Sequence, residues 1–63
     1  MSFTSIKEET RIDVLASFRL GYLAITDITP LIEGWLLSEE YEKVQGAIEA
    51  YNEYKQELDE YKY

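Results

Sequence analysis

The residues of this chain that could carry out acid–base or metal chemistry are closely spaced carboxylates toward its C-terminal end. Glu49, Glu53 and Glu57 follow one another at steps of four residues, and a helix would place them on one face. Such pairs can act as general acid and base or hold a hard cation. Acids at this density are ordinarily a solvated helix surface, and the sequence contains no EF-hand loop and no Glu-x-x-His pair. We therefore predict no metal and no cofactor.

Nucleophilic catalysis lacks the residues it commonly needs. The chain has no histidine and no cysteine, so neither a Ser-His nor a Cys-His arrangement can be assembled. Gly21, Gly34 and Gly46 are isolated from one another, and no glycine-rich phosphate loop is present. We expect a protein that is not an enzyme and that has no small-molecule substrate.

The charge balance limits the classes of partner. Thirteen acidic and six basic side chains give a net charge of -7, which repels nucleic-acid backbones and anionic lipid surfaces unless the bases gather on one face. The bases are scattered along the sequence, which argues against direct binding of nucleic acid and against a membrane partner. The N-terminus has no signal-peptide pattern, and the most apolar stretch, residues 12–25, is interrupted by Asp13, Ser17 and Arg19. These features favour a cytoplasmic protein without a spanning helix.

The pattern of caps and apolar residues predicts an all-α fold. Ser5 and Glu8 have the spacing of a capping box, which indicates a first helix over about residues 5–25. Pro30 after Thr29 is typical of a helix start and predicts a short helix over about 30–37. A long amphipathic helix follows over about 39–61. Without a linker or repeat, residues 1–63 form a single domain, a small helical bundle of two to three helices.

The region around Ser38 leaves two layouts open. Ser38 with Glu39 and Glu40 in the following turn resembles a new N-cap, yet the chain from Pro30 onward could also run as one continuous helix. We prefer a break or kink near Leu37 and Ser38.

The first helix carries apolar residues around most of its circumference, which normally requires more than one neighbour. A chain this short has few neighbours to offer and buries only about 60% of the surface its unfolded form exposes. We therefore expect a homo-oligomer to complete the bundle. The core candidates are Ile12, Leu15, Phe18, Tyr22, Leu31, Trp35 and Leu36.

The last helix carries the clearest periodicity and most of the tyrosines. With Tyr41 at heptad position a, the apolar residues continue at a and d, with one lysine at an a position, while further tyrosines fall at g. Tyrosine is favoured at interfaces because it adds apolar area while its hydroxyl stays near water. The protein-interface candidates are Tyr41, Val44, Ile48, Tyr51, Tyr54, Lys55, Leu58 and Tyr61.

These features favour a helical protein that binds and modulates another protein. In profile the chain resembles the small, acidic, cysteine-free accessory proteins of bacteriophages and mobile elements, which often act on host machinery. An alternative is an acidic nucleic-acid mimic, whose carboxylates would occupy the basic cleft of a DNA- or RNA-binding protein. A mimic needs an extended acidic face free of intramolecular basic partners. A third alternative is a helix-turn-helix DNA-binding regulator, although the charge argues against it.

Overall fold

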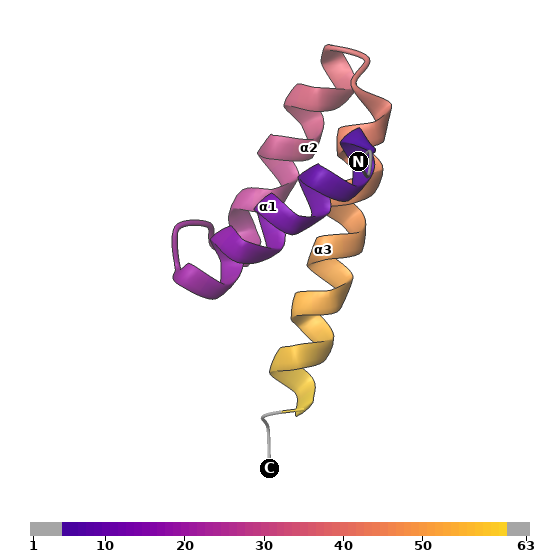
Figure 1. Ribbon diagram of the computed structural model, residues 1–63. Coiled ribbons are helices and arrows are strands. Elements are labelled where there is room, and N and C mark those ends of the chain that lie inside the picture. The colour runs from indigo at the N-terminus through magenta and orange to yellow at the C-terminus, as the bar shows by residue number, and fades with distance from the viewer. Residues whose placement is uncertain (1–4, 61–63) are drawn as a thin grey trace.

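The computed structural model describes residues 5–60, and these form an all-α arrangement of three helices joined by short turns (Figure 1). The helices are α1 (Ile6–Leu20), α2 (Ile28–Leu37), which follows a 3-10 turn at Ile25–Asp27, and α3 (Tyr41–Glu60). Helix α1 crosses α3, whereas α2 runs antiparallel to α3 and the two are joined at one end by a tight turn. The predicted fold class, a small helical bundle, is confirmed.

Helix α1 begins where its cap predicts and ends earlier than expected. The Ser5 side chain accepts a hydrogen bond from the Glu8 backbone N–H at 3.1 Å, which is one half of the predicted capping box. The helix stops at Leu20 because Gly21 adopts a φ of 82°, a left-handed conformation that glycine enters without a Cβ penalty. The Gly21 N–H then donates to the Phe18 carbonyl oxygen, and the Tyr22 N–H donates to that of Ser17. Gly21 is therefore the end of the first helix rather than part of its interior.

Helix α2 begins at Ile28, two residues before the expected start at Pro30. Pro30 lies in the first turn, where its missing N–H leaves no hydrogen bond unmade. The Asp27 carboxylate accepts from the Ala24 backbone N–H at 3.1 Å and fixes the preceding turn.

The predicted break near Leu37 and Ser38 is confirmed, and α2 and α3 are separate helices. The residue that makes the turn is Glu39, which has a φ of 59°, and the Glu40 N–H donates back to the Trp35 carbonyl oxygen at 2.8 Å. Ser38 therefore lies at the end of α2 and does not cap the next helix.

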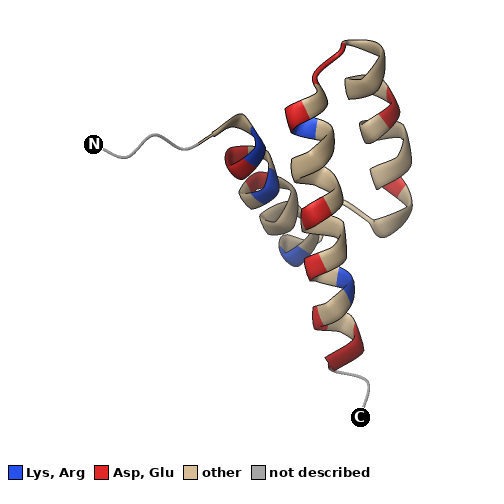
Figure 2. Ribbon diagram, turned by 90° about the vertical axis from the view of Figure 1, so that its right-hand side faces the viewer, with Lys and Arg blue, Asp and Glu red and all other residues tan. Residues whose placement is uncertain are grey.

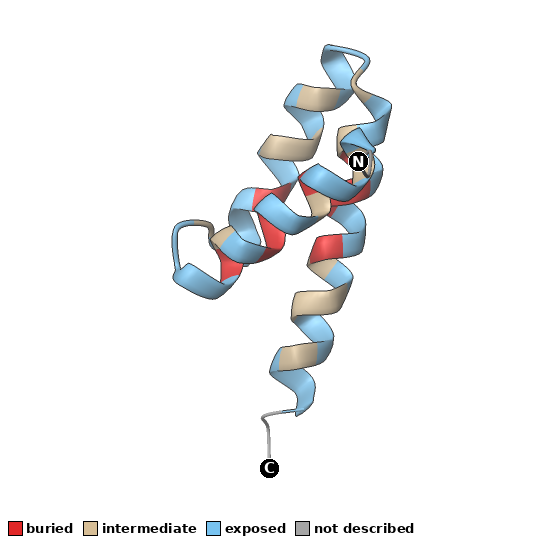
Figure 3. Cartoon of the chain, viewed as in Figure 1, coloured by how far each residue is buried: buried red, intermediate tan, exposed pale blue. Residues whose placement is uncertain are grey.

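The crossing of α1 over α3 depends on small residues in α3. A Cβ built on Gly46 would lie closer than 3.0 Å to the Lys7 carbonyl oxygen, 3.0 Å from the Thr10 Cβ and 3.1 Å from the Arg11 nitrogen. Ala47 and Ala50, on the same side of α3, are completely buried. Glycine and alanine therefore allow the two backbones to approach closely, and buried residues gather at this crossing (Figure 3).

The core contains some of the predicted residues and leaves others outside. Val14, Leu15, Phe18 and Ile28 are buried together with Ala47 and Ala50, and Leu31 and Trp35 pack against them half-buried. The remaining core candidates lie outside the core of the single chain: Ile12 is 50%, Tyr22 82% and Leu36 46% exposed.

Helix geometry explains these three corrections. Helix α3 covers the side of α1 that carries Val14 and Phe18, four residues apart, and Ile12 is turned away from that side. Tyr22 comes after the helix has ended at Leu20. Leu36 lies beside Trp35 on the flank of α2, one residue step beyond the buried stripe.

Candidate protein-interaction surface

The tyrosine-bearing side of α3 is divided between the core and the solvent. Val44 is buried, and Tyr51 and Tyr54 pack half-buried against the core. The Tyr54 ring stacks on Phe18 with the ring centroids 5.0 Å apart and the planes at 9°, a geometry that stabilises an aromatic pair. These three candidates therefore serve the fold of this chain.

The other candidates of α3 are exposed. Tyr41 is 56%, Ile48 45% and Leu58 37% exposed, and Lys55 is exposed as well. Tyr61 lies outside the described residues. The buried side of α3 is turned by about one residue step, roughly 100°, from the predicted seam, because α1 docks where Gly46, Ala47 and Ala50 leave room for its backbone.

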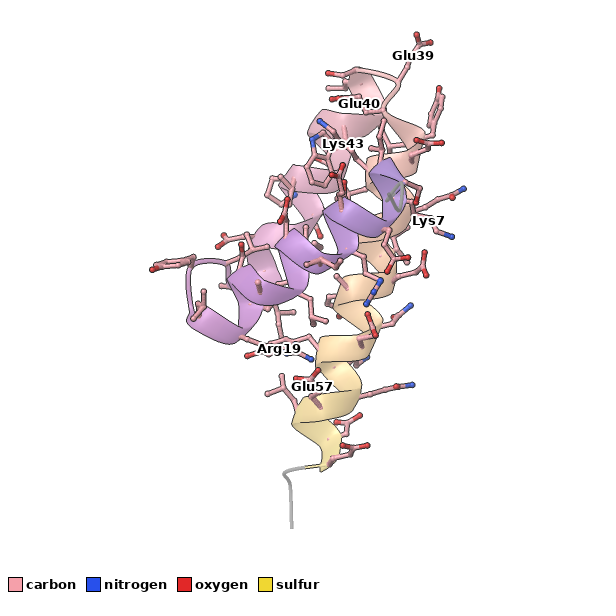
Figure 4. All side chains as sticks on the ribbon, viewed as in Figure 1. Lys7, Arg19, Glu39, Glu40, Lys43 and Glu57 are labelled. Atoms are coloured by element: carbon pink, nitrogen blue, oxygen red, sulfur yellow. The ribbon has the colours of Figure 1, made fainter. Side chains whose placement is uncertain are left out.

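Helices α1 and α3 are also joined by ion pairs that use the carboxylates singled out in the sequence. Lys7 Nζ lies 3.2 Å from Glu49 Oε2, and Arg11 Nη1 lies 2.8 Å from Glu53 Oε2. Arg19 pairs with Glu57, and the two side chains point toward one another in Figure 4. Each carboxylate in the row at steps of four residues is therefore matched by a base of α1.

The contacts of Arg19 and Arg11 shift pKa values. The hydrogen bonds from Arg19 lower the pKa of Glu57 below its ordinary value, and the same contact raises the pKa of Arg19. The Arg11 guanidinium donates to Glu8 and Glu53, and both contacts raise its pKa. Each of these side chains keeps at least a quarter of its surface in contact with solvent. Solvent therefore screens the attraction, and each pair contributes little to stability.

Lys43 makes a further local contact at the start of α3. Its Nζ lies 2.8 Å from Glu40 Oε1 and 5.8 Å from the centroid of the Trp35 ring. The half-buried indole of Trp35 is thus covered by a cation, which the π face of tryptophan attracts.

An exposed surface with two adjacent leucines lies on α2. We call it the α2 outer face and define it as Pro30, Glu33, Gly34, Leu36 and Leu37, all of which are exposed. Leu37 is 88% and Leu36 46% exposed, and together with Glu33 they line a shallow surface hollow. A Cβ built on Gly34 would have no atom within 4 Å. Glu33 is the one charged residue of this helix.

The sequence contained a signal for this surface that periodicity alone did not reveal. From residue 20 to residue 42 the chain has no lysine and no arginine, while it carries five acids. Several of the large exposed hydrophobics fall in this stretch, including Leu20 at 68% and Tyr22 at 82%. Figure 2 accordingly shows red but no blue on α2 and its flanking turns. Exposed apolar residues within a stretch of one charge sign thus mark α2 as distinct from the other two helices.

Among residues 5–60 there is no group of three or more metal-ligating side chains, and no helix in the same part of the chain is long and apolar enough to cross a membrane.

Comparison with known proteins adds no relative to this picture. No protein-family model, no curated protein sequence and no solved structure matches the chain.

Proposed function

We propose that this protein is a non-enzymatic interaction protein that binds another protein through the α2 outer face. The observation that carries the proposal is the exposure of Leu36 and Leu37, at 46% and 88%, on the helix that has the fewest charges. A contiguous apolar area that the fold leaves uncovered is typical of a protein–protein contact. The centres of such contacts are poor in charged residues.

The arrangement of acids disfavours the alternative of a nucleic-acid mimic acting through α3. A mimic needs carboxylates that stay free to replace phosphates. Glu49, Glu53 and Glu57 instead pair with three bases of α1. A helix-turn-helix reader is disfavoured as well, because α2 and the turns beside it contain no base with which to contact phosphate.

The profile of the chain suggests where a partner should be sought. Small acidic helical proteins of this kind resemble bacteriophage and mobile-element accessory proteins, so we propose a component of bacterial host machinery as the partner and modulation of that component as the role.

The experiment is a pull-down from bacterial lysate with three forms of the tagged protein, washed at low and at high salt. The first form is unchanged, the second carries Leu36→Asn with Leu37→Asn, and the third carries Ile12→Asn with Ile48→Asn as a matched control. The control residues are 50% and 45% exposed and lie on the other two helices. Proteins retained by the unchanged form and the control, but lost from the α2 variant, would support the proposal.

Two results would contradict it. Equal retention by all three forms would remove the α2 outer face from binding. Loss from the Ile12 and Ile48 variant alone would move the contact to α1 and α3, where the sequence pattern placed Ile48.

A further inference from the structure

The acids of this chain fall into two groups that differ in whether the fold neutralises them. The acids at steps of four residues in α3 are paired with α1. Glu33, Glu39 and Glu42, by contrast, form no ion pair with any residue between 5 and 60. All three belong to the stretch without a base, residues 20–42. Glu9, Asp13, Asp59 and Glu60 also lack an ion pair within residues 5–60, but only the acids around α2 lie in a stretch without any base.

This charge borders the apolar surface. Glu33 lines the same hollow as Leu36 and Leu37. Glu39 follows two residues after the last residue of α2, and its side chain points away from the helices in Figure 4. The α2 outer face thus has an apolar centre with carboxylates at its side and at its end.

A second copy of the chain fits this surface poorly. Two such faces would bring Glu33 and Glu39 of both copies together, and like charges at an interface are unfavourable and suppress association. A surface with lysine or arginine around an apolar centre would meet the same carboxylates favourably and would be steered toward a protein of net charge -7.

We infer that the partner presents an amphipathic helix whose apolar stripe is flanked by lysine or arginine, and that this helix lies along α2. The inference rests on the proposed function. Helix α2 has ten residues, about 15 Å of length, which matches two to three turns of a second helix. The open space at Gly34 lets the backbone of that helix come close, and Glu33 and Glu39 receive its basic residues.

The test uses two designed helical peptides of about 14 residues, or roughly four turns. One has leucine on one face and lysine on the other, and its counterpart has glutamate in place of every lysine. Each is titrated into the full chain while the backbone amides are followed by NMR and the single tryptophan, Trp35 in α2, by fluorescence. We expect saturable binding of the leucine–lysine peptide, with amide shifts confined to α2 and its flanking turns. The leucine–glutamate peptide should not bind.

Three variants separate the apolar and the charged contributions. Leu37→Asn should weaken binding about tenfold, as expected from losing the burial of one leucine. Glu33→Gln with Glu39→Gln should weaken it about two- to fivefold, the effect of exposed charge pairs. The matched control, Glu9→Gln with Asp59→Asn, changes the net charge equally at exposed positions on α1 and α3 and should leave binding unchanged.

Several results would overturn the inference. Equal weakening by the two double acid variants would mean that only the overall charge attracts the peptide. Amide shifts on α3 would place the contact elsewhere. Light scattering that shows a dimer, disrupted by Leu37→Asn, would make a second copy the occupant. Failure with the peptides is distinguishable from failure of the proposed function, because α2-dependent capture from lysate would persist with a partner that lacks basic residues.

Discussion

The same substitution, glycine to alanine, should change the stability of this protein in opposite directions at different positions. Gly34 lies within α2 with open space where a Cβ would stand. Alanine is favoured over glycine inside a helix by about 0.8–1 kcal/mol, so Gly34→Ala should stabilise by nearly that amount. For a domain of this size the melting temperature should rise by about 4–8 °C for each kcal/mol.

Gly46→Ala should destabilise in spite of the same helix preference. Its Cβ would come closer than 3.0 Å to the Lys7 carbonyl oxygen, whereas ordinary contacts begin at 3.4 Å. The obstacle is backbone, so α1 and α3 must separate by a few tenths of an ångström to about 1 Å. A gap of that size forfeits a quarter to a half of each van der Waals contact, and overpacking typically costs about 1–3 kcal/mol. We expect a net loss of about 2–3 kcal/mol and a melting temperature lower by about 8–24 °C.

Gly21→Ala provides the third member of the series. A Cβ at position 21 would meet no atom within 4 Å, so the loss of stability arises only from the φ of 82°. This left-handed conformation costs an alanine about 1–2 kcal/mol. Thermal and urea unfolding followed by far-UV circular dichroism would rank the variants. If Gly46→Ala raised the melting temperature as Gly34→Ala does, the close crossing of α1 and α3 would be refuted.

Three further predictions concern single contacts. The lowered pKa of Glu57 means that its pair with Arg19 contributes stability above the ordinary value of 4.5 and loses that contribution as the pH falls through the folded-state pKa. The melting temperatures of the unchanged chain and Glu57→Gln should therefore differ at neutral pH and converge in acid, whereas a constant difference would contradict the pairing. Trp35→Ala should lower the free energy of unfolding by about 2 kcal/mol in urea titrations, roughly half the cost at a fully buried aromatic, and an unchanged midpoint would show that the indole does not pack on the core. Glu39→Gly should raise the melting temperature because glycine relieves the left-handed φ of 59°, and a lower value would indicate that the Glu39 side chain supports the turn.

The fold could be predicted from the sequence wherever a local rule decided it. The Ser5 cap determines where α1 starts, because it acts on residues of the same helical turn. The helix-start and helix-break signals at Pro30 and Ser38 predict both ends of α2 to within two residues. The end of α1 was predicted wrongly, because the expected helix over about residues 5–25 runs through Gly21. Gly21 instead ends the helix at a φ of 82°, and the Tyr22 N–H donates to the Ser17 carbonyl oxygen.

The buried side of α3 could not be predicted from the periodicity of its large residues. Tyr41 and Ile48 define the stronger apolar stripe, yet α1 packs against Gly46 and Ala50. Two crossing helices gain most where small residues allow many atoms to touch at once. Which side of α3 becomes buried depends on the shape of the opposing helix. That shape exists only in the assembled fold.

The distribution of charge connects the fold with the proposed binding. Lys7, Arg11 and Arg19 all lie in α1 and face acids of α3, so every base of α1 is compensated by α3. Helix α2 carries no base of its own, and Lys43, whose Nζ lies over the Trp35 ring, pairs with Glu40. Carboxylates without an ion pair therefore lie beside the exposed Leu36 and Leu37, where they would attract a basic partner. If α2 has this role, Glu33→Lys should weaken binding of the leucine–lysine peptide at least as much as the double glutamine variant does. It should not lower the melting temperature, because Glu33 makes no ion pair within residues 5–60.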